Sequence, residues 1–172
     1  MIRKTSLFLF ALLFGAISLS GQADSTKYGH MNLGNLLDEL PETAKAEAIL
    51  RVFADSLNQK DSLMTMAFQE AYLLLKKEYD EGGLTQVQLQ ERQLALEKQR
   101  QEIQKYEEEA QALLESRRNE LLGPILSRVD DAIKAVAKEN GLLMIFDVSS
   151  GSMLFAAETI DVTPMVKTKL GI

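Results

Sequence analysis

The fold of this chain is decided by residues 41–122, PETAKAEAILRVFADSLNQKDSLMTMAFQEAYLLLKKEYDEGGLTQVQLQERQLALEKQRQEIQKYEEEAQALLESRRNELL. After Pro41 this stretch has no proline, and its only glycines are the pair Gly82-Gly83 near its middle. Both flanks are rich in Ala, Leu, Glu, Gln, Lys and Arg, which lose little on entering a helix. At about 1.5 Å per residue, each flank of about 40 residues would form a rod of roughly 60 Å. Since a globular chain of this size has a radius of gyration of about 15 Å, we predict an antiparallel helical hairpin that bends at 82–83 and projects from a small body.

Two apolar stripes of unequal width support the hairpin. Apolar residues on the outgoing flank follow steps of three and four, whereas the return flank repeats them mainly at every seventh position. This repeat comprises Leu89, Leu96, Ile103 and Ala110. A stripe this narrow is typical of a two-stranded coiled coil rather than of a helix inside a bundle. Thr85 and Gln88 have the spacing of a capping box, which would start the return helix.

The N-terminus has the layout of a secretory signal peptide. Basic Arg3 and Lys4 precede an apolar run at 7–19, and small residues follow between Ser20 and Ala23. The apolar run is shorter than the ~20 residues that a membrane-spanning helix needs. We therefore predict that residues 1–23 are a signal peptide and that the mature protein is exported and soluble; an uncleaved anchor is the alternative.

Residues 24–40 and 123–172 form the predicted body. We expect Gly123-Pro124 to break or bend the return helix, and a short amphipathic helix to follow and end at Asn140-Gly141. The apolar run 142–148 predicts a strand covered on both faces, with a second strand returning at 153–157. Thr163 is expected to cap a last helix.

This body is too small to hold a core of its own, because a few short strands and two helices bury little apolar surface. Several copies could solve the problem by pooling their strands into one sheet or barrel. We therefore predict an α+β, mainly α, protein whose β-sheet body oligomerises and carries the coiled-coil arms outward. The expected contact residues are Leu143, Ile145, Phe146, Leu154 and Phe155.

The composition excludes several classes of function. A formal net charge of -6 argues against nucleic acid as a partner, and the absence of cysteine excludes thiol chemistry. The single histidine, His30, cannot form a metal or catalytic site alone. The acidic run 107–109 is read as a solvated helix face. We predict no enzyme activity, no metal and no cofactor.

Apolar residues on the outgoing helix outnumber those that the thin return stripe can cover. The candidates for binding a partner are Phe53, Met64, Phe68, Tyr72, Leu75 and Tyr79. Apolar surface left over on an arm indicates an interaction site, and flexible Met suits varied partners. The alternative, which the sequence leaves open above all for Phe53 and Phe68, is that these residues only pack between the two helices.

The order of these elements resembles the Skp (OmpH-like) family of periplasmic chaperones over nearly all of the mature chain. The resemblance rests on YGHMN (28–32), LPE (40–42), the charged hairpin, PIL (124–126), IKAVAKENG (133–141), LLMIFDV (142–148), SSG (149–151) and DVT (161–163). It implies a trimer with a β-sheet body and three helical arms around a cavity. It also implies a periplasmic holdase that binds unfolded outer-membrane β-barrel proteins without ATP.

One departure and one alternative remain at this point. Well-known members of that family are basic, whereas this chain is acidic, which argues against contact with lipopolysaccharide or a membrane surface. The alternative function is a structural coiled-coil adaptor of the cell envelope. Such an adaptor would bind folded partners at the arm tips and would have no affinity for unfolded chains.

Overall fold

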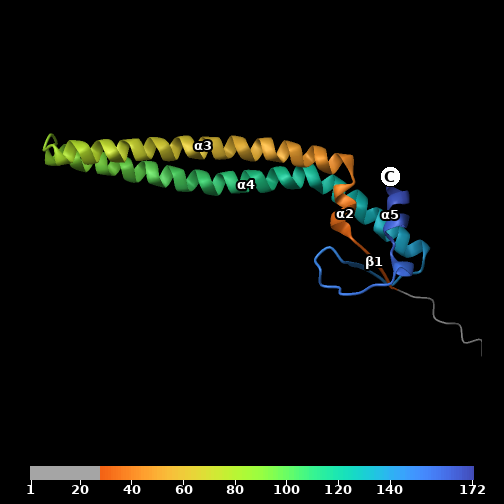
Figure 1. The fold of residues 1–172 in the computed structure, drawn as a ribbon. Helices are drawn as coiled ribbons and strands as arrows, with labels where there is room; N and C mark the ends of the chain where they lie inside the picture. Colours follow the sequence, from red (N-terminus) through yellow and green to blue (C-terminus); the bar gives the residue numbers. More distant parts are fainter. Residues whose placement is uncertain (1–27) are drawn as a thin grey trace, which may run out of the picture.

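A computed structural model describes residues 28–172, so the signal peptide expected at 1–23 lies outside the described residues. The elements in chain order are β1 (Tyr28–Met31), α2 (Leu33–Asp38), α3 (Pro41–Asp80), α4 (Gln86–Glu139), β2 (Met144–Asp147), the 3-10 helix η1 (Glu158–Ile160) and α5 (Thr163–Leu170). Helices α3 and α4 run side by side as a long arm, and the other elements gather at its base (Figure 1). The predicted hairpin on a small β-containing body is therefore confirmed.

The turn between α3 and α4 forms because each side of it is capped. Gly82 adopts a left-handed backbone with φ of 69°, a conformation that a residue with a Cβ adopts only at a cost. The N–H of Gly83 donates to the carbonyl of Glu78 over 3.1 Å. On the return side the predicted capping box is present, with the N–H of Thr85 donating to the side chain of Gln88 over 2.9 Å and the N–H of Gln88 donating back to the Thr85 hydroxyl.

The return helix is not broken at Pro124, contrary to one of the two outcomes that the sequence suggested. Helix α4 is continuous through this proline, although its last part turns away from the arm into the body (Figure 1). Proline has no N–H for the carbonyl of Glu120, but Gly123 and Pro124 are exposed, so water can reach that carbonyl. Beyond the proline, Ile125 and Val129 are buried in the body, and this packing holds the helix together.

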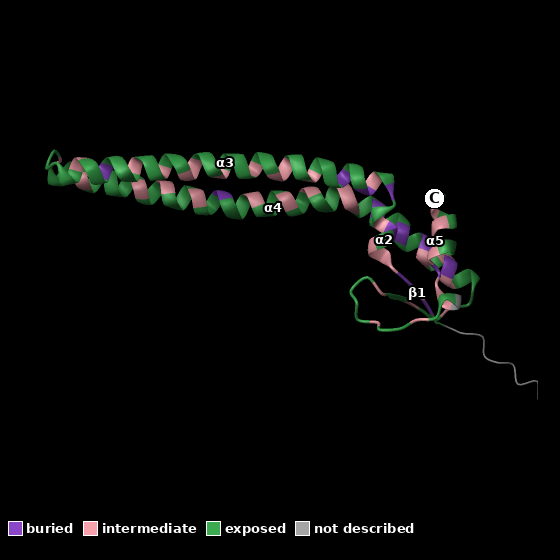
Figure 2. Ribbon diagram, in the orientation of Figure 1, coloured by how far each residue is buried: buried purple, intermediate pink, exposed green. Residues whose placement is uncertain are grey.

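The core lies in the body, where β1, α2, α3, α4 and α5 contribute buried residues and Ile145 of β2 packs against them. Its most deeply buried side chains are Met31, Leu36, Leu40, Val129, Val136, Val162 and Val166, each at most 2% exposed. Figure 2 shows this concentration of buried residues at the base, while most of the arm is exposed or intermediate. One chain thus has a small core at one end and a long, thinly packed arm at the other.

The sheet differs from the one expected. Strands β1 and β2 pair in parallel, with His30 opposite Phe146, and on the other edge of β1 His30 forms a bridge with Asp161. The second strand expected at 153–157 is absent, because this segment is a loop. β2 is also not covered on both faces, since Met144 and Phe146 are exposed. The segment 153–157 does not pair with the second edge of β2, so the sheet of the described chain has only two strands.

Two aspartates anchor chain reversals in the body. The Asp147 carboxylate accepts hydrogen bonds from the N–H groups of Leu33 (3.1 Å) and Ser149 (2.9 Å) and from the Ser149 hydroxyl (2.7 Å). At the start of α5, the Asp161 carboxylate accepts from the N–H of Thr163 over 2.8 Å. Thr163 is not the N-cap residue of α5 that we expected. Val162 occupies the N-cap position, and its side chain makes no capping hydrogen bond.

These bonds make the body sensitive to acid. Burial raises the pKa of Asp147, but the hydrogen bonds from Ser149 and Leu33 outweigh it, so the pKa lies below its ordinary value of 3.8. A lowered folded-state pKa stabilises the protein above the ordinary value, and this contribution is lost as the pH falls through the folded-state pKa. We expect Asp147→Asn to lower the urea midpoint at pH 7 and the gap from wild type to close near pH 2. Asp131→Asn, at an exposed site on α4, is the control, and an equal gap at both pH values would contradict the role of the charge.

Candidate functional site

The seam between α3 and α4 is thin. Along the arm beyond Ala46, the buried side chains are Leu75 of α3 and Tyr106 of α4. The remaining seam residues are only half-buried, as the mixture of exposed and intermediate positions in Figure 2 shows. Two helices that touch along one line can each cover only a narrow stripe of the other, so apolar residues outside that stripe stay in contact with water.

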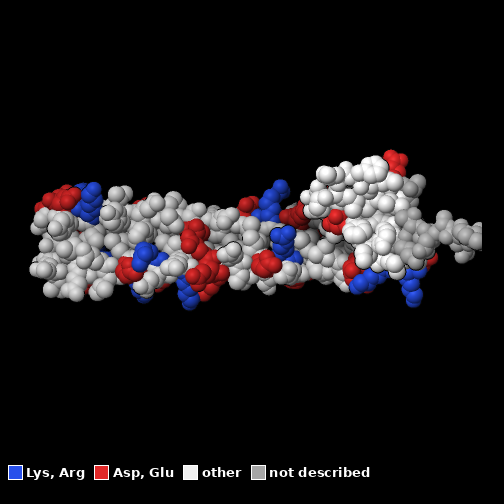
Figure 3. All heavy atoms as spheres, turned by 90° about the horizontal axis from the view of Figure 1, so that it is seen from below, with Lys and Arg blue, Asp and Glu red and all other residues white. Residues whose placement is uncertain are grey.

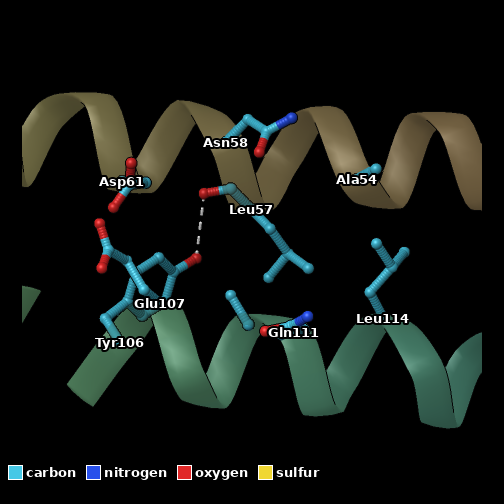
Figure 4. Close-up of a pocket in the computed structure, with 9 residues that line it drawn as sticks. Ala54, Leu57, Asn58, Asp61, Tyr106, Glu107, Gln111 and Leu114 are labelled. Atoms are coloured by element: carbon cyan, nitrogen blue, oxygen red, sulfur yellow. Dashed lines mark hydrogen bonds between the residues drawn. The ribbon is translucent and has the colours of Figure 1, made fainter. Parts of the chain in front are cut away.

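Polar contacts supplement this thin packing at three places. The hydroxyl of Tyr106 donates to the backbone carbonyl of Leu57 over 3.1 Å (Figure 4), and the ammonium of Lys60 lies 4.3 Å from the centre of the same ring. Ion pairs join the two helices near the ends of the arm, between Arg92 and Glu78 at the tip and between Arg128 and Glu42 at the base. These contacts fix the register of the helices relative to each other.

Tyr106 is the clearest of these fixed points, because its bond crosses the arm near the middle. Tyr106→Phe removes the hydroxyl and leaves the Leu57 carbonyl without that donor, which should lower the free energy of unfolding by about 1 kcal/mol. Tyr79→Phe is the matched control, since the Tyr79 side chain is 60% exposed and should tolerate the change. Urea unfolding of the two variants measures the difference, and equal stability would mean that the bond contributes nothing.

The predicted partner-binding residues fall into two groups. Phe53, Met64 and Phe68 are half-buried and Leu75 is 8% exposed, so these side chains share in the seam. Tyr72 and Tyr79 are 53% and 60% exposed. An incoming chain would therefore meet the two tyrosines fully and the half-buried residues in part, whereas it would hardly reach Leu75.

A second apolar stripe on α3 lies outside the six residues that we predicted to bind a partner. It consists of Val52, Leu63 and Leu74, with Ile49 one turn before the first. Residues eleven apart lie about three turns apart on one helix face, and the exposed fractions of Val52, Leu63 and Leu74 are 68%, 57% and 47%. We call these four residues the outer stripe. The signal was present in the sequence as an eleven-residue recurrence beside the seam.

A groove runs along one side of the arm base. It consists of three adjoining hollows with volumes of about 270, 330 and 270 Å³. The first, next to α2, shares Glu47, Arg118 and Leu122 with the second. The second shares Ala54 and Leu114 with the third, which ends at Asp61, Tyr106 and Glu107 (Figure 4). The shared walls make the three hollows a continuous depression along the seam.

Some charged residues of the arm pair within one helix. Among the described residues such pairs include Lys98–Glu102, Lys105–Glu109 and Arg117–Glu120, all on exposed surface. Hydrogen bonds from Arg100 and then Gln101 hold the pKa of Glu97 below its ordinary value. Exposed pairs contribute little stability, so their main effect is to keep the surface of α4 charged and hydrated.

The body carries the other exposed apolar surface. Leu143, Phe146, Leu154 and Phe155, which were predicted to mediate oligomerisation, are 66%, 44%, 98% and 85% exposed. Ile145, the fifth predicted residue, packs against the core instead. The edge of β2 away from β1 pairs with no other strand of the described chain. Figure 3 shows a large part of the body free of charged side chains on the side seen from below.

Comparison with known proteins agrees with this architecture. A sequence model of the family described as outer membrane protein (OmpH-like) matches residues 27–170. The chain belongs to the OmpH-like family. The resemblance seen in the sequence is thereby confirmed, and family membership places the chain among chaperones and not among enzymes. No curated protein sequence matches the chain.

The OmpH-like fold is also found in a crystal structure at 2.83 Å resolution of an OmpH-like protein from Caulobacter crescentus CB15, which is assigned as an outer membrane chaperone. The two chains superpose with a TM-score of 0.63 at 14% sequence identity, covering 84% of this chain and 83% of the other. At this identity the likeness concerns the fold alone.

Metal binding and membrane insertion are two further properties that the described residues allow us to assess. Within residues 28–172, no three His, Cys, Asp or Glu side chains come together in a way that could hold a metal ion. No helix in the same part of the chain is long and apolar enough to span a bilayer.

Proposed function

We propose that this OmpH-like protein is an ATP-independent periplasmic holdase that binds unfolded outer-membrane β-barrel proteins and prevents their aggregation. The observation that carries the proposal is the apolar surface that α3 leaves exposed outside the seam. The outer stripe lies on one side, and Tyr72 and Tyr79 lie near the tip. Apolar surface of this extent on a solvated protein indicates an interaction site.

The binding mode follows from how this surface is spread. The arm offers many separate apolar side chains and no deep pocket, so each contact with a client is weak and the total depends on how much chain is engaged. The exposed ion pairs of α4 keep the complex hydrated. An unfolded β-barrel chain held in this way cannot pair its strand edges with another copy, which is the route to aggregation.

The holdase predicts a dependence on the outer stripe. An unfolded β-barrel outer-membrane protein diluted from urea should scatter less light when an equimolar amount of the OmpH-like protein is present, without nucleotide. The variant Val52→Ser/Leu63→Ser/Leu74→Ser removes three exposed apolar side chains, and we expect it to require about tenfold more protein for the same effect. A second variant, Tyr72→Ser/Tyr79→Ser, tests the residues near the tip.

A matched control carries Gln59→Ser, Gln69→Ser and Lys76→Ser, three exposed polar positions of the same helix. It should protect the client as well as wild type does. The thermal unfolding of every variant is recorded, because serine lowers helix propensity in the stripe variant and in the control alike. No protection by wild type would refute the holdase and favour the envelope adaptor, which binds folded partners.

We also propose that three copies join through their bodies, so that the arms enclose a cavity for the client. Leu154 and Phe155 are the most exposed large apolar side chains of the body, and the second edge of β2 is free within the described chain. A free strand edge beside exposed apolar side chains favours pairing with another copy.

The association predicts that Leu154→Glu/Phe155→Glu abolishes assembly, because two carboxylates cannot be buried against an apolar partner without large cost. Sedimentation velocity should give a trimer for wild type and a monomer for this variant. Val87→Glu/Leu94→Glu, at exposed positions in the outer half of the arm, is the control and should remain a trimer. A wild-type monomer at micromolar concentration would contradict the cavity.

A further inference from the structure

The groove along the arm base has an apolar floor and charged ends. Its middle is lined by Leu50, Ala54, Leu57, Ala110 and Leu114. From Glu47 to Asp61 it follows fourteen residues of α3, or about 20 Å. A chain in extended conformation covers that length with about six residues. The groove therefore has the dimensions of a short extended segment.

The end of the groove away from the body is acidic. Asp61 of α3 and Glu107 of α4 point toward each other across the seam (Figure 4). No ion pair within 4.0 Å includes either carboxylate in the described part of the chain, and one carboxylate oxygen of Asp61 is buried without a hydrogen-bond partner. The nearby ammonium of Lys60 lies instead over the Tyr106 ring.

The part nearer the body has a different charge. Arg51 and Arg118 line the second hollow together with Glu47, so basic side chains are available there. The groove is thus acidic at one end, apolar in the middle and of mixed charge at the other end, where Asp38, Glu47 and Arg118 line the first hollow. Two facing carboxylates repel each other, and a cation placed between them removes the repulsion and gains attraction from both.

We propose that this groove binds an extended segment of an unfolded client chain, about six residues long, with apolar side chains in the middle and a lysine or arginine at one end. The basic side chain lies between Asp61 and Glu107, and the apolar side chains lie on the floor formed by Leu50, Ala54 and Leu57. This inference rests on the proposed holdase function and gives it a preference among client segments.

The charge complementarity is what selects this occupant. A purely apolar segment would leave the Asp61 and Glu107 carboxylates facing each other without a cation, and an acidic residue at that end would add a third negative charge. A segment with its basic residue at that end satisfies both carboxylates while it covers the apolar floor. The groove thereby discriminates between segments of equal hydrophobicity by the sign of one side chain.

Two fluorescein-labelled peptides test the preference. They share a central Leu-Phe-Ala-Leu stretch and differ only in carrying Lys or Glu at one end, and their binding to the mature protein is measured by fluorescence anisotropy at low salt. We expect the Lys peptide to bind about fivefold more tightly than the Glu peptide. Asp61→Asn/Glu107→Gln should abolish this ratio, and 0.5 M salt should reduce it.

Asp55→Asn/Glu108→Gln is the matched control, because it removes the same two charges from the same two helices at exposed positions that line none of the three hollows. It should keep the fivefold ratio. An equal loss in both variants, or no preference in wild type, would overturn the groove inference. Suppression of client aggregation by wild type is measured in parallel. If wild type shows no peptide preference but still suppresses aggregation, the groove inference is wrong and the proposed holdase function is unaffected. Loss of protection by wild type would overturn both.

The occupant itself can be identified because the sequence has no native cysteine. Asn58→Cys places a single thiol beside the third hollow, where it can carry a benzophenone maleimide, and Ser62→Cys places one at an exposed site outside it. Irradiation with the Lys peptide should label the protein from position 58 and not from position 62. A cross-link from position 58 to a second copy of the chain would assign the groove to the assembly and refute the inference.

Discussion

Two helices packed along a single line bury little, and most features of this structure follow from that constraint. Each helix of the arm can cover only a narrow stripe of its partner, so Leu75 and Tyr106 are buried while Val52 and Leu63 are not. A third helix would cover the outer stripe and turn the arm into a bundle. The described chain has no such third helix, so the arm is long, weakly packed and apolar on more than one side. Exposed apolar surface of this kind suits a chaperone, whereas most monomeric domains avoid it.

The body compensates for the thin arm because it concentrates the core. Helix α4 belongs to both parts, and its continuity through Pro124 links the orientation of the arm to the packing of Val129 and Val136 in the body. The ion pair of Arg128 with Glu42 adds a second link at the same place. The arm is therefore held firmly at its base and only by sparse contacts further out. Splaying of the arm tips would disturb few buried side chains, so it should require little energy.

The sequence predicted the local features of the hairpin better than the contacts of the body. Helix-forming residues, a glycine with positive φ at Gly82 and the Thr85 capping box are signals that act within a few residues, and all of them operate in the structure. The parallel pairing of β1 with β2 joins residues more than 100 positions apart, and no local pattern encodes it. The strand expected at 153–157 does not form although the second edge of β2 is free, so an apolar run after a turn does not by itself bring a segment into the sheet. At the site, spacing found the exposed Tyr72 and Tyr79, but it could not tell which residues the partner helix covers, and so it included Leu75.

The charged residues of this acidic chain have different roles that depend on their positions in the arm. Several charged side chains of the arm pair with neighbours on their own helix, and such pairs keep the surface hydrated without selecting a partner. Asp61 and Glu107 differ, because they come from separate helices, face each other and lie where the apolar groove ends (Figure 4). Their positions depend on the register that the Tyr106 bond to Leu57 sets one turn away. The contact that stabilises the middle of the arm therefore also places the two carboxylates, and a shift of one helix along the other would separate them and close the acidic end of the groove.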